Sequence, residues 1–188
     1  VVVSGGLSTG IGFAMKDILE NIYYGISLMT GRIKIGDYIV CDGIRGRVSS
    51  ISYTSTMLEA LDGSVIAFQN SQLFTKNYKN MTKNHGYELD ILEVGIAYGS
   101  NINKVKKMLV DAITALGITY TEKSVQVMIK SFDDSCVTLK VLVWVNVFTQ
   151  GSDDSAIMEC IYETLEKNGI EIPFPQREIT IKHQTIEE

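Results

Sequence analysis

The chain has few of the residues that form disulfide frameworks, metal centres or nucleic-acid-binding surfaces. Its 188 residues include three cysteines and two histidines, and its 17 basic and 22 acidic residues give a net charge of −5. An odd number of widely spaced cysteines predicts neither a disulfide framework nor a zinc site, and indicates reduced thiols in a cytosolic compartment. A sequence-independent nucleic-acid grip needs a basic surface, so nucleic acid is not an expected partner.

Catalytic arrangements are also missing. No spacing predicts a Ser-His-Asp or Cys-His site. The acidic pairs Asp133-Asp134 and Asp153-Asp154 fall at a predicted turn and a predicted helix start, where local hydrogen bonds and the helix dipole favour acids. We therefore expect neither an enzyme nor a bound metal or cofactor.

What the chain does have is an opening run, residues 1–32, in which small residues recur at helical spacing. Glycine inside a water-exposed helix costs about 1 kcal/mol relative to alanine, so a monomeric soluble helix of this kind would be poorly specified. In a membrane, small residues spaced in this way let several helices pack closely. The small residues form two narrow faces, Gly6, Gly10 and Ala14 on one, and Gly5, Ser8 and Gly12 on the other.

The run has the length of a partial membrane span. At about 1.5 Å per residue, residues 1–16 cover about 24 Å of a hydrocarbon layer about 30 Å thick, so we expect the chain to begin inside a span. Lys16, Asp17 and Glu20 then interrupt the apolar run, and an amphipathic, interfacial continuation follows. The positive-inside bias of the basic residues from Arg32 onward predicts that everything after about residue 31 is cytoplasmic.

The same glycines allow a different interpretation. A strand at residues 1–4, a glycine turn and a helix would resemble the dinucleotide-binding start of short-chain dehydrogenases, with NAD(P) at the turn. Two features disfavour it. The chain has no Tyr-x-x-x-Lys dyad, and the residues after Arg32 read as consecutive strands.

Residues 38–68 are rich in β-branched and aromatic residues, with turn pairs at Asp42-Gly43 and Asp62-Gly63. We expect strands near 37–41, 45–53, 55–61 and 64–68. Four or five short antiparallel strands in about 45 residues suit a small, Sm-like β-barrel.

In residues 83–188 the spacing of apolar residues changes from that of consecutive strands to that of alternating strands and helices. The pattern predicts a strand at 87–97, a helix at 102–116, a hairpin of strands at 126–132 and 136–147, a helix at 152–168 and a last strand at 178–182. This βαββαβ order is the ferredoxin-like α/β plan. The predicted organisation is therefore a membrane helix with its continuation (1–31), a β domain (32–82) and an α+β domain (83–188).

Taken in order, these segments resemble the small-conductance mechanosensitive channel family over nearly the whole chain. The resemblance depends on a series of motifs: Gly12-Phe13-Ala14, Asp17-x-Leu19-x-Asn21, Ile35-Gly36-Asp37-Tyr38-Ile39, Gly46-x-Val48-x-x-Ile51, Ser55-Thr56, Asp62-Gly63-Ser64, Asn70-Ser71, Ala97-Tyr98-Gly99-Ser100, Val143-Trp144-Val145 and Gly169-Ile170-x-Ile172-Pro173-Phe174-Pro175-Gln176.

The resemblance implies a homo-oligomeric channel, a heptamer, in the inner (cytoplasmic) membrane. Its subunits would span the membrane several times, contact lipid, and release ions and small osmolytes during hypoosmotic shock when tension opens the pore. The family's two pore-constricting positions fall on Thr9 and Phe13, which lie one helical turn apart. Thr9 replaces the usual leucine, so which ring is narrower stays open.

The resemblance also suggests where charge and bending lie. Lys16 lies a turn beyond Phe13 and, with Glu20, either faces the permeation path or forms an ordinary i,i+4 pair. The family's helix-breaking glycine falls on Asp17, and Gly25 is the alternative hinge. Two other functions stay open, an NAD(P)-binding dehydrogenase-like protein and a non-conducting interaction module tethered to a membrane.

Overall fold

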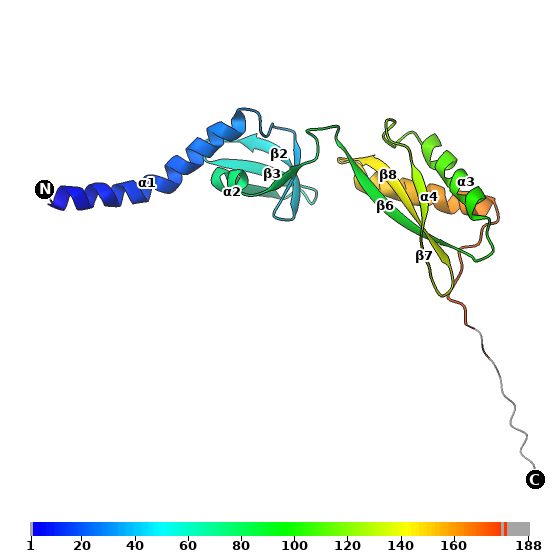
Figure 1. Ribbon diagram of the computed structural model, residues 1–188. Helices are drawn as coiled ribbons and strands as arrows, with labels where there is room; N and C mark the ends of the chain where they lie inside the picture. Colours follow the sequence, from blue (N-terminus) through cyan, green and yellow to red (C-terminus); the bar gives the residue numbers. More distant parts are fainter. Residues whose placement is uncertain (1, 178, 180–188) are drawn as a thin grey trace, which may run out of the picture. The chain divides into compact units, whose positions relative to one another are not determined.

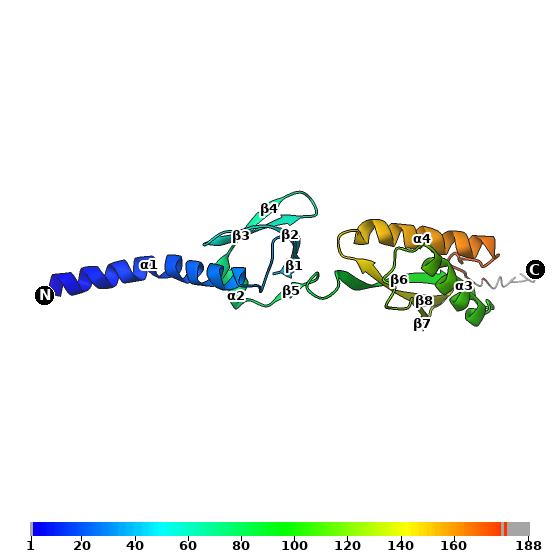
Figure 2. The same cartoon turned by 90° about the horizontal axis from the view of Figure 1, so that it is seen from above.

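The computed structural model of the chain describes residues 2–177 and 179. The chain divides into two compact units, residues 1–87 and residues 88–188, each with its own apolar core. Figures 1 and 2 show the elements of each unit. Within the described residues, no helix combines the length and the apolar character needed to cross a lipid bilayer.

The first unit opens with a long helix, α1 (Val2–Met29). Because residues 2–29 are helical, the alternative interpretation with an opening strand and a phosphate-binding turn is wrong. A five-stranded sheet follows, in the order β4-β3-β2-β1-β5. Its strands are β1 (Tyr38–Cys41), β2 (Ile44–Ile51), β3 (Ser55–Ala60), β4 (Val65–Gln69) and β5 (Tyr78–Asn80).

The predicted turn at Asp42-Gly43 joins β1 to β2. Asp42 has φ 52° and Gly43 has φ 77°, so both central residues are left-handed, as a two-residue type I′ hairpin turn requires. The antiparallel register pairs Cys41 with Ile44 directly across this turn. The Lys76 ammonium forms an ion pair with the Asp42 carboxylate and ties the turn to the residue after the short helix described next.

Two short elements of this unit were not predicted. They are the helix α2 (Asn70–Thr75), which follows β4 without a loop, and β5, which pairs antiparallel with β1. In the part of the chain that the structure describes, β4 and β5 are the edge strands of the sheet. The predicted closure of this sheet into a small barrel stays a prediction.

The core of this unit joins the helices to the sheet. Leu28 of α1 and Leu73 of α2 are fully buried with apolar side chains of the strands. The cluster consists of Leu28, Ile33, Ile39, Cys41, Val48, Leu58, Phe68 and Leu73. The C-terminal half of α1 is therefore part of the folded β domain.

The second unit is an α+β layer. Its elements are β6 (Tyr87–Ile96), α3 (Ile102–Ala115), β7 (Gln126–Phe132), β8 (Val137–Asn146) and α4 (Gln150–Lys167), and its sheet order is β6-β8-β7. This is the βαββα part of the predicted ferredoxin-like order. The predicted last strand, 178–182, lies outside the described residues except for Ile179.

Both helices of this unit lie along the sheet (Figure 1). Each of them buries one apolar stripe in the core. The side chain of Asn101 caps α3 by accepting a hydrogen bond from the Lys104 amide, 3.1 Å away. Gly117, with φ 70°, ends α3, and Gly169, with φ 66°, ends α4, as the sequence predicts. The buried stripes are Val105, Leu109 and Ile113 in α3, and Ile157, Ile161 and Leu165 in α4.

Candidate functional site

The predicted pore residues lie on one face of α1. At about 100° per residue, Thr9, Phe13, Lys16 and Glu20 fall within an arc of about 60°. Phe13 is 75% exposed, and Thr9 and Lys16 are exposed as well. A bulky aromatic side chain thus projects from this face without burial in its own chain.

The two faces of small residues flank this arc on both sides. Gly6, Gly10 and Ala14 lie on one side, and Gly5 and Gly12 on the other, by the same helical geometry. A carbon placed at the Cβ position of Gly6, Gly10 or Gly12 would meet nothing within 4 Å. Within its own chain the helix therefore has open space along both small faces.

The opposite side of the helix is apolar. Ile11 and Ile18 lie roughly across the helix from Thr9, and each is 53% exposed. Exposed apolar side chains gathered on one side of a helix mark a contact surface. α1 thus has four sides of different character: an aromatic and charged arc, two bare flanks and an aliphatic back.

The C-terminal half of α1 is fixed to the sheet at Gly25. A Cβ atom there would lie 2.3 Å from the Tyr53 carbonyl oxygen and 2.5 Å from Asn70 Nδ2, so only glycine fits this contact. Asn70 is fully buried and is held in place by two hydrogen bonds. Its Nδ2 donates to the Ser52 carbonyl at 2.9 Å, and its Oδ1 accepts from the Thr56 hydroxyl at 2.9 Å.

Asn21 makes a second connection between α1 and the β domain. Its Oδ1 accepts a hydrogen bond from the Ser71 backbone amide at 2.9 Å, and its Nδ2 donates to the Asp17 carbonyl at 2.9 Å. The Ser71 amide is in the first turn of α2, where backbone donors lack helical partners. Asn21 therefore caps α2 from another helix.

Aromatic stacking adds a third connection. The rings of Tyr24 and Phe74 stack with centroids 4.5 Å apart, and the Arg32 guanidinium lies 4.2 Å from the Phe74 centroid. An Arg positioned over an aromatic face is stabilised by the ring quadrupole. Phe74 of α2 thus contacts both Tyr24, near the end of α1, and Arg32, which follows the helix.

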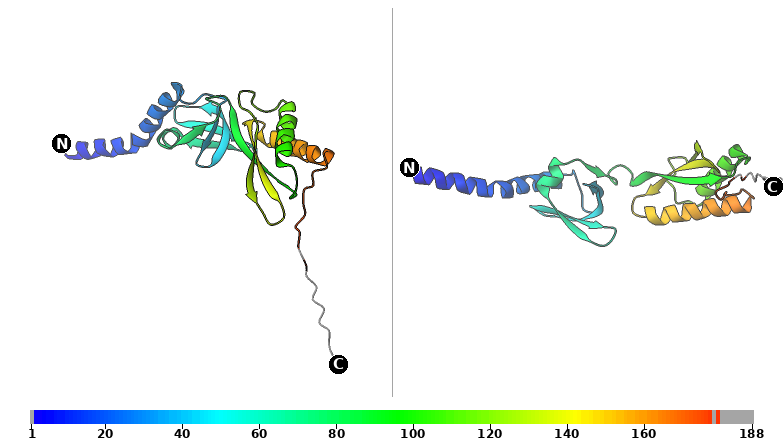
Figure 3. Two further views of the ribbon diagram at one scale, coloured as in Figure 1. Left: turned by 45° about the vertical axis from the view of Figure 1, so that its right-hand side comes forward. Right: turned by 90° about the horizontal axis from the view of Figure 1, so that it is seen from below.

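The two predicted hinge positions lie within one continuous helical element, since α1 extends from Val2 to Met29. The ribbon changes direction part-way along α1 (Figure 3, left). Asp17 is exposed, whereas Gly25 is buried in the junction with the sheet. Hinge function at either residue stays a prediction.

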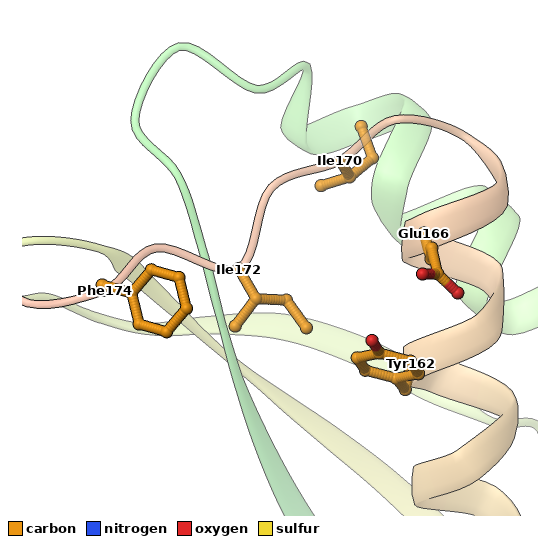
Figure 4. Close-up of a pocket in the computed structure, with 5 residues that line it drawn as sticks. All are labelled: Tyr162, Glu166, Ile170, Ile172 and Phe174. Atoms are coloured by element: carbon orange, nitrogen blue, oxygen red, sulfur yellow. The ribbon is translucent and has the colours of Figure 1, made fainter.

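The second unit contains an open apolar pocket of about 370 Å³ at the end of α4 (Figure 4). The side chains that line it supply one carboxylate, and a carboxylate alone does not form a catalytic arrangement. They are Tyr162, Glu166, Ile170, Ile172 and Phe174. No cluster of three metal-ligating side chains occurs in residues 2–177 or at 179.

Comparison with known proteins connects the two units to one family. Residues 17–83 match the family "Mechanosensitive ion channel, beta-domain", and residues 90–172 match "Mechanosensitive ion channel MscS, C-terminal". The chain belongs to the MscS family. This family consists of mechanosensitive channels and not of enzymes.

Relatives within the MscS family cover the chain almost completely. An uncharacterized MscS family protein of Archaeoglobus fulgidus is 32% identical over 94% of this chain and 63% of its own length. The small-conductance mechanosensitive channel of Helicobacter pylori is 28% identical over 98% of this chain and 68% of its own length. The chain spans about three fifths of the first two curated relatives it matches.

Two solved structures share the fold. The closed-state crystal structure of Helicobacter pylori MscS superposes with a TM-score of 0.82 at 29% identity, covering 97% of this chain and 73% of that one. Arabidopsis thaliana MSL1, at 15% identity, superposes with a TM-score of 0.73 over 93% of this chain and 65% of that one, which shows a shared fold.

The sequence did not predict the contacts between α1 and the β domain. Asn21, Asn70 and Ser71 stand in the motifs that carry the family resemblance, but their roles could not be read from those motifs. The signal that could have found them is composition: an amide side chain on the amphipathic continuation of α1 and another directly after a strand. Both positions are buried polar residues that need partners.

Proposed function

We propose that this chain contributes the pore-lining helix and the cytoplasmic domains of a mechanosensitive channel subunit. The channel is a homo-oligomer, a heptamer, in the cytoplasmic membrane. Membrane tension opens it, and ions and small osmolytes leave the cell during hypoosmotic shock. The observation that carries the proposal is the arc of Thr9 and Phe13 flanked on both sides by bare glycine faces.

A ring of helices needs this distribution of side chains. Each helix in a ring presents one side to the lumen and contacts a neighbour on each flank, and small residues on both flanks let backbones approach closely. Gly6 and Gly10 would face one neighbour, and Gly5 and Gly12 the other. The aliphatic back, with Ile11 and Ile18, would then face lipid or preceding helices of the subunit.

Phe13 supplies the gate in this proposal. A ring of Phe13 side chains around a narrow lumen excludes water, and an apolar constriction without water stops ions without a plug. Tilting the helices apart widens and wets the ring. Tension favours that change because the open pore occupies more membrane area, and the glycine flanks let helices slide without side chains unlocking.

The junction at Asn21 and Gly25 would transmit the motion. Two contacts fix the C-terminal half of α1 to the β domain. They are the Asn21–Ser71 hydrogen bond and the close approach of Gly25 to Tyr53. In the N-terminal half of α1, a Cβ atom at Gly6, Gly10 or Gly12 would meet nothing within 4 Å, so these glycines make no close contact with the β domain. We therefore expect the part of α1 that precedes Asn21, including Asp17, to tilt while the β domain keeps its contacts with the C-terminal half of the helix.

Charge on the lumen face predicts weak ion selectivity. Lys16 and Glu20 share the arc of Phe13, and a ring of each would place opposite charges one helical turn apart. Their fields partly cancel. Reversal potentials measured in a salt gradient should lie near zero, and a strong cation preference would contradict this arrangement.

The copy number of the assembly tests the proposal. The intact protein, purified in detergent and imaged by electron cryomicroscopy, should show seven chains with the N-terminal halves of α1 around a central axis. A monomer, or an assembly in which α1 does not surround the axis, would contradict it and leave a non-conducting interaction module.

A further inference from the structure

The face of α4 that packs on the sheet is apolar along most of the helix but carries an acidic side chain in its first turns. Ile157 and Ile161 are buried against the sheet, and one more step back along the same stripe reaches Asp154 and then Gln150. On β6, Val94 and Ile96 are buried, and the same face of the strand continues back through Asp90. Two carboxyl groups thus meet where the pattern would place apolar side chains.

Contacts between α4 and β6 confirm this meeting. Gln150 Nε2 donates a hydrogen bond to Asp90 Oδ2 at 2.5 Å, and the Asp90 carboxyl is the strongest acidic influence on the Asp154 carboxyl. Asp154 Oδ1 is buried and has no hydrogen-bond partner among the described residues. Two ionised carboxylates in this position repel each other, and a hydrogen bond between them would require one of them to carry a proton.

We propose that Asp90 and Asp154 form a proton-sensitive contact, which holds the first turns of α4 on β6 when the pair carries a proton and loosens them when both carboxyls are ionised. The contact belongs to the second unit alone. It is therefore independent of whether α1 lines a pore.

The electrostatic surroundings support this proposal. Burial, followed by the neighbouring Asp90 carboxyl, raises the pKa of Asp154 to about 6. The other charges that act on it are also acidic, Asp153 on α4 and Glu88 on β6. Like charges around a desolvated carboxyl disfavour its ionised form, so the proton is retained until the pH approaches neutrality.

The direction of the pH effect follows from linkage. An aspartate whose pKa is higher in the folded state than in the unfolded chain stabilises the fold most when it is protonated. The stabilisation falls as the pH rises from about 4 through about 6, and it is constant above that window. For a shift from 3.8 to about 6, the opening equilibrium of this contact rises by about tenfold between pH 5 and 7.5.

Amide hydrogen exchange of the intact protein measures this opening directly. After correction for the intrinsic pH dependence of exchange, protection of the amides at 151–158 should fall by about tenfold from pH 5 to pH 7.5. Asp154→Asn and, separately, Asp90→Asn should remove this dependence, because an amide can donate to the remaining carboxylate at every pH. Glu163→Gln, an exposed acid on the same helix, should keep it.

Two results would overturn the proposal. One is wild-type protection at 151–158 that does not change between pH 5 and 7.5. The other is a pH dependence that persists undiminished in both Asp154→Asn and Asp90→Asn, which would assign it to other groups. Because two independent variants carry the test, a folding defect in one of them does not remove it.

Discussion

Replacing Gly25 with alanine should separate α1 from the β domain. The new Cβ would lie 2.3 Å from the Tyr53 carbonyl oxygen, where ordinary contact begins near 3.4 Å, so the helix must move by about 1 Å or the sheet must distort. The same atom would lie 2.5 Å from Asn70 Nδ2, whose hydrogen bond to the Ser52 carbonyl is part of the buried core. Neither neighbour is the flexible end of an exposed side chain.

The magnitude follows from three contributions. Overpacking a core contact costs about 1–3 kcal/mol, and displacing the buried Asn70 amide from its partner costs about 1–3 kcal/mol. The higher helix propensity of alanine offsets about 1 kcal/mol. The net destabilisation of the junction is about 3 kcal/mol, which corresponds to about a 100-fold change in an equilibrium constant.

Hydrogen exchange at the Ser71 amide reads out this junction, because that amide donates to Asn21 Oδ1 across it. Its protection in Gly25→Ala should fall by about 100-fold. The matched control is Gly151→Ala in α4, where an added Cβ meets nothing within 4 Å and should leave Ser71 unchanged. Native-like protection of the Ser71 amide in Gly25→Ala would show that the close contact at Gly25 does not hold α1 on the β domain.

Three further changes have definite expected outcomes. Phe13→Ser should lower the tension at which channels open in patch recordings, because a polar ring stays wet; an unchanged or higher threshold would reject the gate assignment. Asn21→Ala removes the cap of α2 and should lower the free energy of opening at the Ser71 amide, measured by hydrogen exchange, by about 1–2 kcal/mol. The same Ser71 protection in Asn21→Ala as in the native protein would show that the cap contributes nothing. Hydrogen bonds from the Thr138 and Ser131 hydroxyls lower the pKa of Asp133, so protection of the β7–β8 turn should fall as the pH drops below about 4, and Asp133→Asn should abolish that change.

Much of the fold could be predicted because local signals and the burial pattern agree. The Asp42-Gly43 pair determines a hairpin whose left-handed residues suit few other sequences. Every second side chain of β8 from Val137 to Val145 is buried, as the predicted strand period of two requires. Where a local pattern of a few residues determines a turn or a strand, the sequence is sufficient to predict it.

The short elements and the long-range polar contacts could not be predicted. α2 has six residues and β5 has three, too few for a periodic pattern. The Asn21–Ser71 hydrogen bond joins residues 50 positions apart, so only tertiary structure brings them together. Asp153 is explained by the helix start, since it accepts from the Thr149 hydroxyl at 2.7 Å, but its neighbour Asp154 faces β6 instead.

Current through a stretched bilayer shows directly whether this chain forms part of a tension-gated channel. The intact protein should be reconstituted into liposomes and recorded in excised patches under stepped suction. We expect channels that open as tension rises, with openings at lower tension for Phe13→Ser than for the native protein. Patches that contain the folded protein and pass no current at any tension below lysis would contradict it.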